Sequence, residues 1–312
     1  MIFAIFITIL FIIAFVIGAS YFAYRMAFYP APRLTDPDYK MPHGPQYDVF
    51  KDHITQSVQD MLSRPFKPVT ITSHDGKKLY ARYYHTADGA PLQIQFHGYK
   101  SSAPVDFSGG SKLAIKTGHN ALVVDQRSHG RSEGSSITFG IEERYDVLSW
   151  VNYAISRFGD DTKIILAGLS MGAATVLMAT DLDLPKNVVG VMADCPYSSP
   201  SEIIKTVCKR DMHLPPTLIY PFVKLGARIF GGFNIEESSA VTAVGKAKIP
   251  ILIIHGEDDR FVPCSMSHAI HQNCTSLVTL ETVPDAGHGL CYMVAPKRYE
   301  EVTGAFVAKI LG

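Results

Sequence analysis

The chain has 312 residues, a length that suits one α/β domain with a small appendage better than two separate domains. Lysine plus arginine number 29, and so do aspartate plus glutamate. This balance excludes a net positive potential that would favour binding of nucleic acid or another polyanion. The five cysteines have no regular spacing, so they give no disulfide framework and agree with a reducing compartment.

The N-terminal segment is the most hydrophobic part of the chain. No charged side chain occurs from Ile2 to Tyr24, and a helix of about 20 such residues crosses a bilayer. A cleaved signal peptide is the alternative, but the apolar stretch exceeds an ordinary signal-peptide core and no lysine or arginine precedes it. We therefore expect residues 1–25 to be an uncleaved, single-pass membrane anchor.

The residues after the anchor predict its orientation. The nearby positive charges, Arg25, Arg33 and Lys40, all follow the apolar stretch, so the positive-inside rule places the rest of the chain in the cytoplasm. Residues 26–67 are rich in proline and predict a tether that packs on the domain, with one helix over residues 48–61. An aromatic belt is expected at the membrane surface, formed by Tyr21, Phe22, Tyr24 and Tyr29.

The main folded domain is expected over residues 68–312. Two predicted strands, residues 69–72 and 78–83, flank the turn His74-Asp75-Gly76 and form an antiparallel hairpin. Later apolar runs alternate with helical patterns, and runs that are apolar on both faces indicate a mostly parallel sheet covered by helices on both sides. These runs end at Phe96, Val124, Leu166, Met192 and Ile254.

A histidine–glycine pair follows the strand that ends at Phe96. Gly98 lets the backbone approach a bound molecule closely. The amide N–H of Tyr99 is our candidate for one of two fixed donors to an oxyanion, because such donors stabilise charge that appears only in a transition state. His97 is expected to brace this loop rather than to transfer protons.

The strongest local signal is the segment 163–174, in which a buried strand runs into Gly168-x-Ser170-x-Gly172 and then into a helix of small residues. Side chains at the two glycine positions would collide where strand turns into helix, and the sharp turn presents the serine hydroxyl above the sheet. The helix N-terminus directs amides toward developing negative charge, so the N–H of Met171 is the second candidate donor. We predict Ser170 as a nucleophile; a tight turn without chemistry is the alternative.

Residues 194–248 are expected to form a helical lid. No buried strand is evident there, whereas residues 201–209 and 217–230 have helical patterns. The apolar residues of the second helix either line an acyl pocket or pack onto the sheet, and both remain open: Leu218, Ile219, Phe222, Val223, Leu225, Ile229 and Phe230.

A serine hydroxyl needs a base to take its proton, and the base needs an acid to orient it. Asp259, in the acidic loop after a buried strand, is our candidate acid, with Asp258 and Asp194 as alternatives. His288, the last of twelve histidines, lies in a glycine-bounded loop after the final predicted strand and is our candidate base.

No metal and no cofactor are expected. A possible metal-binding face on one predicted helix matches no common zinc pattern: Cys264, His268, His271 and Cys274. Cys291, close to His288, is expected to be a small buried hydrophobe.

These motifs together resemble the α/β-hydrolase superfamily over residues 68–312. The resemblance implies a mostly parallel eight-stranded sheet with helices on both faces, a catalytic domain with a small helical lid, Asp259 as the acid, and bracing roles for Asp125 and Arg127. It is carried by Gly168–Gly172, His97-Gly98, residues 125–132, residues 255–259 and Gly287-His288. Within the superfamily the chain is similar to bacterial membrane-anchored proteins related to esterases, lysophospholipases and acylaminoacyl peptidases.

The function that residues and resemblance favour is hydrolysis of a carboxylic ester through an acyl-enzyme, on a small acylated or lipid-derived substrate. A serine peptidase acting on short or acylated peptides is one alternative, although no charged subsite for a peptide terminus is evident. A non-catalytic binding protein that keeps the fold is another, against which the complete set of Ser170, Asp259 and His288 argues. No nucleic-acid partner is expected, and the sequence leaves the oligomeric state open.

Overall fold

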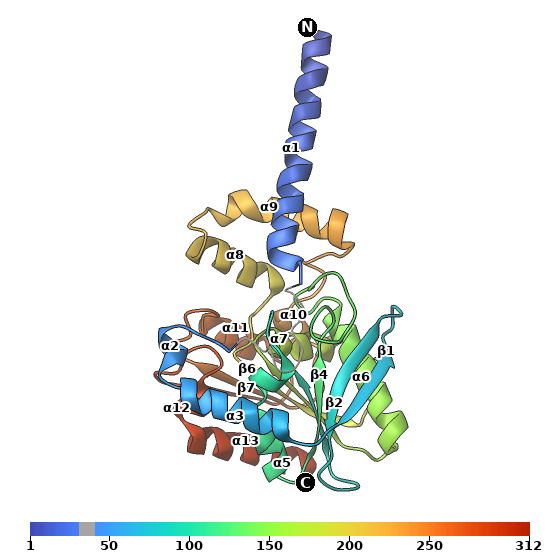
Figure 1. Cartoon of the computed structure of the whole chain (residues 1–312), viewed down its shortest axis with the longest axis vertical. Coiled ribbons are helices and arrows are strands. Elements are labelled where there is room, and N and C mark those ends of the chain that lie inside the picture. Colours follow the sequence, from blue (N-terminus) through green and yellow to red (C-terminus); the bar gives the residue numbers. More distant parts are fainter. Residues whose placement is uncertain (31–40) are drawn as a thin grey trace.

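Eight strands form one sheet in the order β1-β2-β4-β3-β5-β6-β7-β8 in the computed structural model, which describes residues 1–30 and 41–312 (Figure 1). β1 and β2 form the expected hairpin, β2 pairs antiparallel with β4, and the remaining pairings are parallel. The predicted mostly parallel, eight-stranded sheet is therefore confirmed. The strands are β1 (Lys67–Thr72), β2 (Lys78–Tyr84), β3 (Leu92–Phe96), β4 (Asn120–Asp125), β5 (Ile164–Leu169), β6 (Val188–Asp194), β7 (Ile251–Gly256) and β8 (Val278–Val283).

Helices cover both faces of the sheet. In β4, Leu122 and Val124 belong to the core on one face, whereas Ala121 and Val123 belong to the core on the other. The first face is covered by α6 (Glu143–Phe158), α7 (Met171–Met178), α10 (Ala240–Val244) and α11 (Ser265–Asn273). The second is covered by α3 (Lys51–Ser63), α4 (Ala103–Asp106), α5 (Gly110–Lys116), α12 (Cys291–Val294) and α13 (Pro296–Leu311).

The N-terminal helix α1 (Ile2–Phe28) projects from the rest of the molecule (Figure 1). By length and composition it is able to cross a membrane, and the protein does not bury its apolar window. The helix continues three residues beyond the expected end of the anchor, and its last turns are buried at Ser20, Tyr24 and Phe28. Tyr24 therefore packs inside the protein instead of joining an aromatic belt, and its hydroxyl lies 2.6 Å from Ser136 Oγ.

In its described residues 41–67 the tether contains two helices where one was predicted, namely α2 (Pro45–Asp48) and α3, because the chain bends at Val49 and Phe50 between them. Arg33 and Lys40, on which the predicted orientation partly rests, lie outside the described residues.

A helical segment between β6 and β7 lies on top of the sheet and against α1 (Figure 1). It contains α8 (Pro200–Arg210), α9 (Pro216–Gly226), the π-helical turn η2 (Ala227–Gly231) and α10. A side chain at Gly226 would overlap the carbonyl oxygen of Ser20, so the backbones of α9 and α1 approach closely.

Candidate functional site

Ser170 occupies a strained turn between β5 and α7. Its backbone has φ 55° and ψ −114°, a conformation that non-glycine residues rarely adopt. A side chain at Gly172 would overlap the carbonyl oxygen of Phe96, and one at Gly168 would overlap the backbone of Gly172. The close approach of α7 to β3 and β5 therefore requires both glycines, as the sequence predicted, and it presents the Ser170 side chain at the carboxyl end of the sheet.

The structure brings Ser170, His288 and Asp259 into one hydrogen-bonded chain. His288 Nε2 lies 2.9 Å from Ser170 Oγ, and His288 Nδ1 lies 2.6 Å from Asp259 Oδ2. A carboxylate only accepts, so Nδ1 carries the proton and Nε2 is free to accept the serine proton. This is the protonation pattern that a general base requires.

Asp259 is held as an ionised acceptor. Its Oδ1 accepts the amides of Phe261 and Val262, both at 2.8 Å, and its Oδ2 faces His288 and His255, the latter at 3.2 Å. Burial alone would raise the pKa of Asp259, but the bonds from the two histidines outweigh it and hold the pKa well below its usual range. Asp258, the adjacent alternative for the acid, is exposed.

Asp194, the other alternative, does not bond to His288; its Oδ2 accepts the hydroxyl of Tyr299 at 3.1 Å. Burial, partly offset by His255 and Tyr299, raises the pKa of Asp194 to about 6. The unfolded carboxyl titrates near 3.9. The native state therefore binds more protons than the unfolded state between those values, and this group lowers stability as pH rises from about 4 to 6.

Asp194→Asn is accordingly expected to stabilise the protein at pH 7.5 by on the order of 2–3 kcal/mol, because the buried charge is removed. The gain should disappear near pH 3, where the wild-type carboxyl is protonated in both states. Chemical unfolding at the two pH values measures this difference. A variant that is equally or less stable than wild type at pH 7.5 would contradict the burial of an unfavourable charge.

Two buried neutral histidines brace the loop that follows β3. His97 Nε2 accepts the amide of Gln126 at 3.1 Å, so its proton is on Nδ1, which donates to the Gly98 carbonyl. His129 Nε2 likewise accepts the amide of Lys100 at 3.0 Å. Burial lowers the pKa of His97 well below its usual value and that of His129 to about 4. His97 thus has the bracing position expected from the sequence.

Asp106 is a contact that sequence reasoning missed. Its Oδ2 accepts the Gly98 amide at 2.6 Å, and its Oδ1 accepts the Ser101 hydroxyl at 2.5 Å. It reaches the loop from α4, eight residues further along the chain, with no motif to mark it. Gly98 itself lies beside the nucleophile position, because a side chain there would have its Cβ 3.3 Å from Ser170 Cβ.

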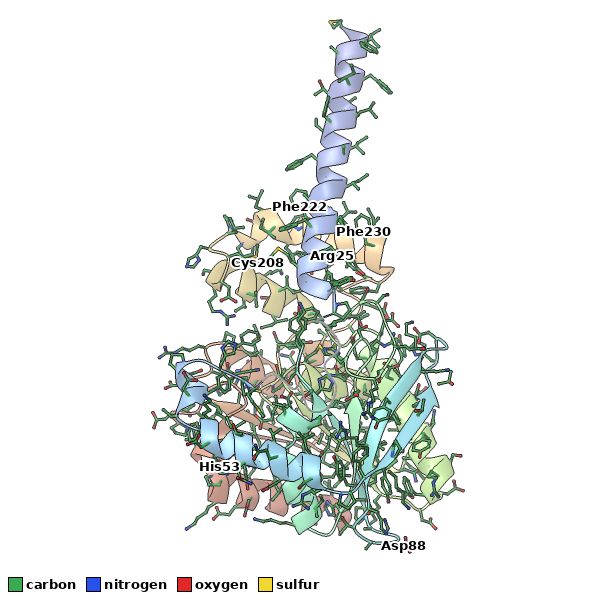
Figure 2. The ribbon with its side chains drawn as sticks, in the orientation of Figure 1. Arg25, His53, Asp88, Cys208, Phe222 and Phe230 are labelled. Atoms are coloured by element: carbon green, nitrogen blue, oxygen red, sulfur yellow. The ribbon has the colours of Figure 1, made fainter. Side chains whose placement is uncertain are left out.

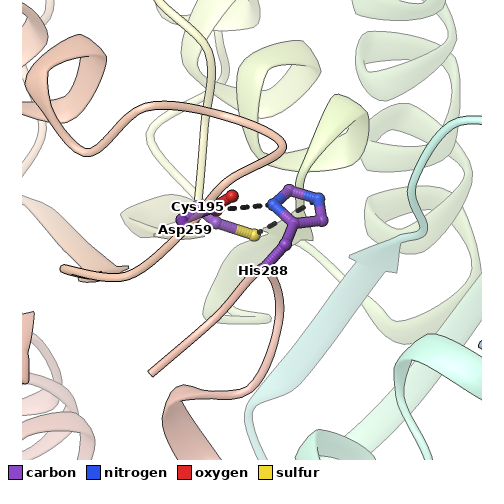
Figure 3. A group of neighbouring side chains, drawn as sticks. All are labelled: Cys195, Asp259 and His288. Atoms are coloured by element: carbon purple, nitrogen blue, oxygen red, sulfur yellow. Dashed lines mark hydrogen bonds and ion pairs between the residues drawn. The ribbon is translucent and has the colours of Figure 1, made fainter. Parts of the chain in front are cut away.

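Cys195, also missed, lies beneath the imidazole of His288, with Sγ 3.9 Å from Nε2 (Figure 3). The ligand atoms of Cys195, Asp259 and His288 lie within 4.8 Å of one another. This set fits a metal poorly, because Asp259 and His288 already bond to each other and burial raises the pKa of the Cys195 thiol well above its usual value. In a second cluster, His74, Asp75 and Glu142, the two carboxylates pair with the Arg127 guanidinium, which already supplies positive charge.

Three other residues named from the sequence, Asp125, Arg127 and Cys291, hold the structure together or lie buried in it. Arg127 makes a buried bidentate pair with Asp146, with both bonds at 2.6 Å, and Asp125 accepts the amide of Arg131. Cys291 is buried, as expected. In the part of the chain that the structure describes, no three ligand atoms gather from the predicted helix face of Cys264, His268, His271 and Cys274.

A cavity of ≈ 580 Å³ opens beside Ser170 and His288. Its walls come partly from the tether, through Met41 and Tyr47, and the Tyr47 hydroxyl donates to the His288 carbonyl at 2.9 Å. None of the seven lid residues proposed for an acyl pocket lines this cavity. They pack within the lid and against α1 or face outward, because α1 holds α9 above the sheet.

The strand order and the strained turn between β5 and α7 define the α/β-hydrolase fold. The esterase Pf2001 of Pyrococcus furiosus has the same fold, with a TM-score of 0.68 and 23% identity over 91% of this chain and 99% of that one. Residues 96–245 match the model described as "Alpha/beta hydrolase family", so the resemblance read from the sequence is confirmed.

Two curated relatives share this similarity. The uncharacterized protein YqkD of Bacillus subtilis (strain 168) is 25% identical over 195 residues, which are 62% of this chain and 64% of that protein. The chain thus spans less than two thirds of YqkD. The bifunctional esterase/perhydrolase DCH of Acinetobacter calcoaceticus is 22% identical over 265 residues, covering 70% of this chain and 92% of that protein.

Proposed function

We propose that this chain is a serine hydrolase that cleaves carboxylic esters through an acyl-enzyme intermediate. The observation that carries the proposal is the hydrogen-bonded chain from Ser170 Oγ through His288 to Asp259, presented on a strained turn. The esterases among the proteins of similar fold and sequence support the same reaction class.

In the first half-reaction, Ser170 Oγ attacks the ester carbonyl carbon while His288 Nε2 takes its proton. The bond from this carbon to the alkoxy oxygen then breaks, and His288 returns the proton to the leaving alcohol. In the second half-reaction, water attacks the acyl carbon, gives its proton to His288, and releases the acid as Ser170 regains its proton. Asp259 orients the imidazole and stabilises its charged form.

The oxyanion is assigned to the amides of Tyr99 and Met171. Met171 is the first residue of α7, and Tyr99 follows Gly98, which lies against Ser170. Among the described residues, neither amide has a hydrogen-bond partner, so both are available as donors. Two fixed donors in a partly dry site stabilise the tetrahedral intermediate more than the planar ester.

A small acylated or lipid-derived substrate fits the cavity. The volume of the cavity lies within the range of small-molecule sites, and apolar side chains form much of the cavity wall. Among them are Val105, Phe107, Leu169, Phe261, Leu290 and Met293. We further assign α1 as a single-pass anchor, with the catalytic domain on the cytoplasmic side, because Arg25 lies at the end of α1 nearest that domain.

Turnover of p-nitrophenyl esters of graded acyl length, measured beside matched p-nitroanilides, tests this function on the full chain in vesicles. Ester hydrolysis and labelling by a fluorophosphonate are the expected results. Turnover of the anilides alone would indicate a serine peptidase instead of an esterase. Absence of both turnover and labelling would leave a binding protein.

A further inference from the structure

We propose that α9 and η2, residues 216–231, lie on the surface of the bilayer that α1 crosses, with one apolar face at the boundary between headgroups and acyl chains. The inference rests on the proposed membrane anchor and adds a second, peripheral contact with phospholipid. The lid would then be a membrane-docked element rather than a cover for the cavity.

The lid helix is apolar on two faces. One face, with Tyr220, Val223 and Ala227, is buried in the protein core. The other recurs at helical spacing through Leu218, Phe222, Leu225 and Ile229. Leu218 is 60% exposed and Ile229 is 53% exposed. An apolar helix face is normally buried, so the outward face requires a second apolar environment.

The contacts with α1 set the depth of this face. Phe222 packs on Phe15 with ring centroids 6.4 Å apart, and Phe230 packs on Tyr21 at 5.0 Å. Figure 2 shows Phe222 and Phe230 beside α1, above the sheet. Gly226 places the crossing point at Ser20.

Counting along α1 relates that crossing point to the membrane. The helix from residue 2 to residue 19 rises about 27 Å at about 1.5 Å per residue, close to the thickness of the hydrocarbon layer. α9 therefore crosses α1 where this layer ends, and it lies across α1 rather than along it (Figure 1). An amphipathic helix in this position buries its apolar face in the interface.

The charge of the segment also favours a phospholipid surface. Residues 215–232 contain no aspartate or glutamate; Lys224 pairs with Glu236 just beyond this range, and Arg228 is exposed. Arg25, whose guanidinium lies 3.5 Å from the ring centroid of Tyr29, adds positive charge near the same end of α1. Anionic headgroups attract basic residues at this depth.

Tryptophan substitution in the full chain tests this contact, because the only native tryptophan, Trp150, is 0% exposed and gives a constant background. Leu218→Trp and Ile229→Trp proteins are reconstituted in vesicles of phosphatidylcholine and phosphatidylglycerol with bromine on acyl carbons near the carbonyl group. Phe11→Trp, on the exposed part of α1, reports the anchor. Leu277→Trp is the matched control, since Leu277 is 51% exposed and precedes β8 at the opposite end of the strands.

Bromine near the lipid carbonyl is expected to quench the emission of Leu218→Trp and Ile229→Trp. Bromine placed further down the lipid acyl chain is expected to quench Phe11→Trp. Neither lipid should quench Leu277→Trp. Quenching of Phe11→Trp without quenching of the two lid variants would overturn the docking while leaving the anchor intact. Lid variants with blue-shifted but unquenched emission would assign the face to a second copy of the chain and also overturn it. An unquenched Phe11→Trp would remove the anchor and the docking together.

Discussion

Replacing Ser170 by alanine is expected to lower kcat for ester hydrolysis by about 10⁴- to 10⁶-fold, because the attacking oxygen is lost. The protein should remain folded, since alanine removes only one buried oxygen and keeps the Cβ that already fits this turn. Steady-state kinetics with a p-nitrophenyl ester measure the loss, and thermal unfolding checks the fold.

Ser170 and His288 are expected to act as one unit, so the double alanine variant should be no slower than either single variant by more than a small factor. Ser238→Ala is the matched control, because Ser238 is also buried but lies outside the cavity lining. A Ser170→Ala protein that keeps more than a tenth of wild-type kcat would contradict nucleophilic catalysis by this residue.

The Asp259→Asn substitution is expected to reduce kcat by about 10⁴-fold. The amides of Phe261 and Val262 both donate to Oδ1, so the asparagine oxygen must face them and its NH₂ group must face His288. The imidazole then receives a hydrogen bond at Nδ1 and carries its proton on Nε2, where it cannot accept the proton of Ser170. Kinetics together with ¹⁵N chemical shifts of the imidazole measure both the loss and its cause.

Asp258→Asn and Asp194→Asn are the controls for this change. The first alters an exposed neighbour and the second a buried carboxyl that bonds to Tyr299 rather than to His288. Both should keep kcat within a few-fold of wild type. A loss at Asp194 as large as the loss at Asp259 would mean that the working acid follows β6 instead of β7.

Local sequence patterns are sufficient to predict much of the fold. The apolar run predicted to end at Phe96 matches the end of β3, and the runs ending at Val124 and Met192 stop within two residues of the ends of β4 and β6. These strands are buried along nearly their whole length, so their apolar runs can be recognised without knowledge of the neighbouring strands. The strained turn at Ser170 is equally local, because two glycines and a following helix encode it.

Contacts between distant segments could not be predicted in the same way. Asp106 and Tyr47 reach the site through the packing of α4 and the tether, and neither carries a motif. The sequence predicted that the outward face of α9 is apolar, but the environment of this face depends on how α1 crosses α9. Periodicity identifies which side chains share a face; it does not identify what covers that face.

The proposed covalent step at Ser170 is open to direct measurement. The full chain is mixed with a p-nitrophenyl ester, quenched in acid within one turnover, and digested for mass spectrometry. A mass increase of one acyl group on the peptide that contains Ser170, absent from the Ser170→Ala protein, is the expected result. An acyl group on another residue, such as the Cys195 thiol, or an adduct of equal yield in the Ser170→Ala protein would refute Ser170 as the nucleophile.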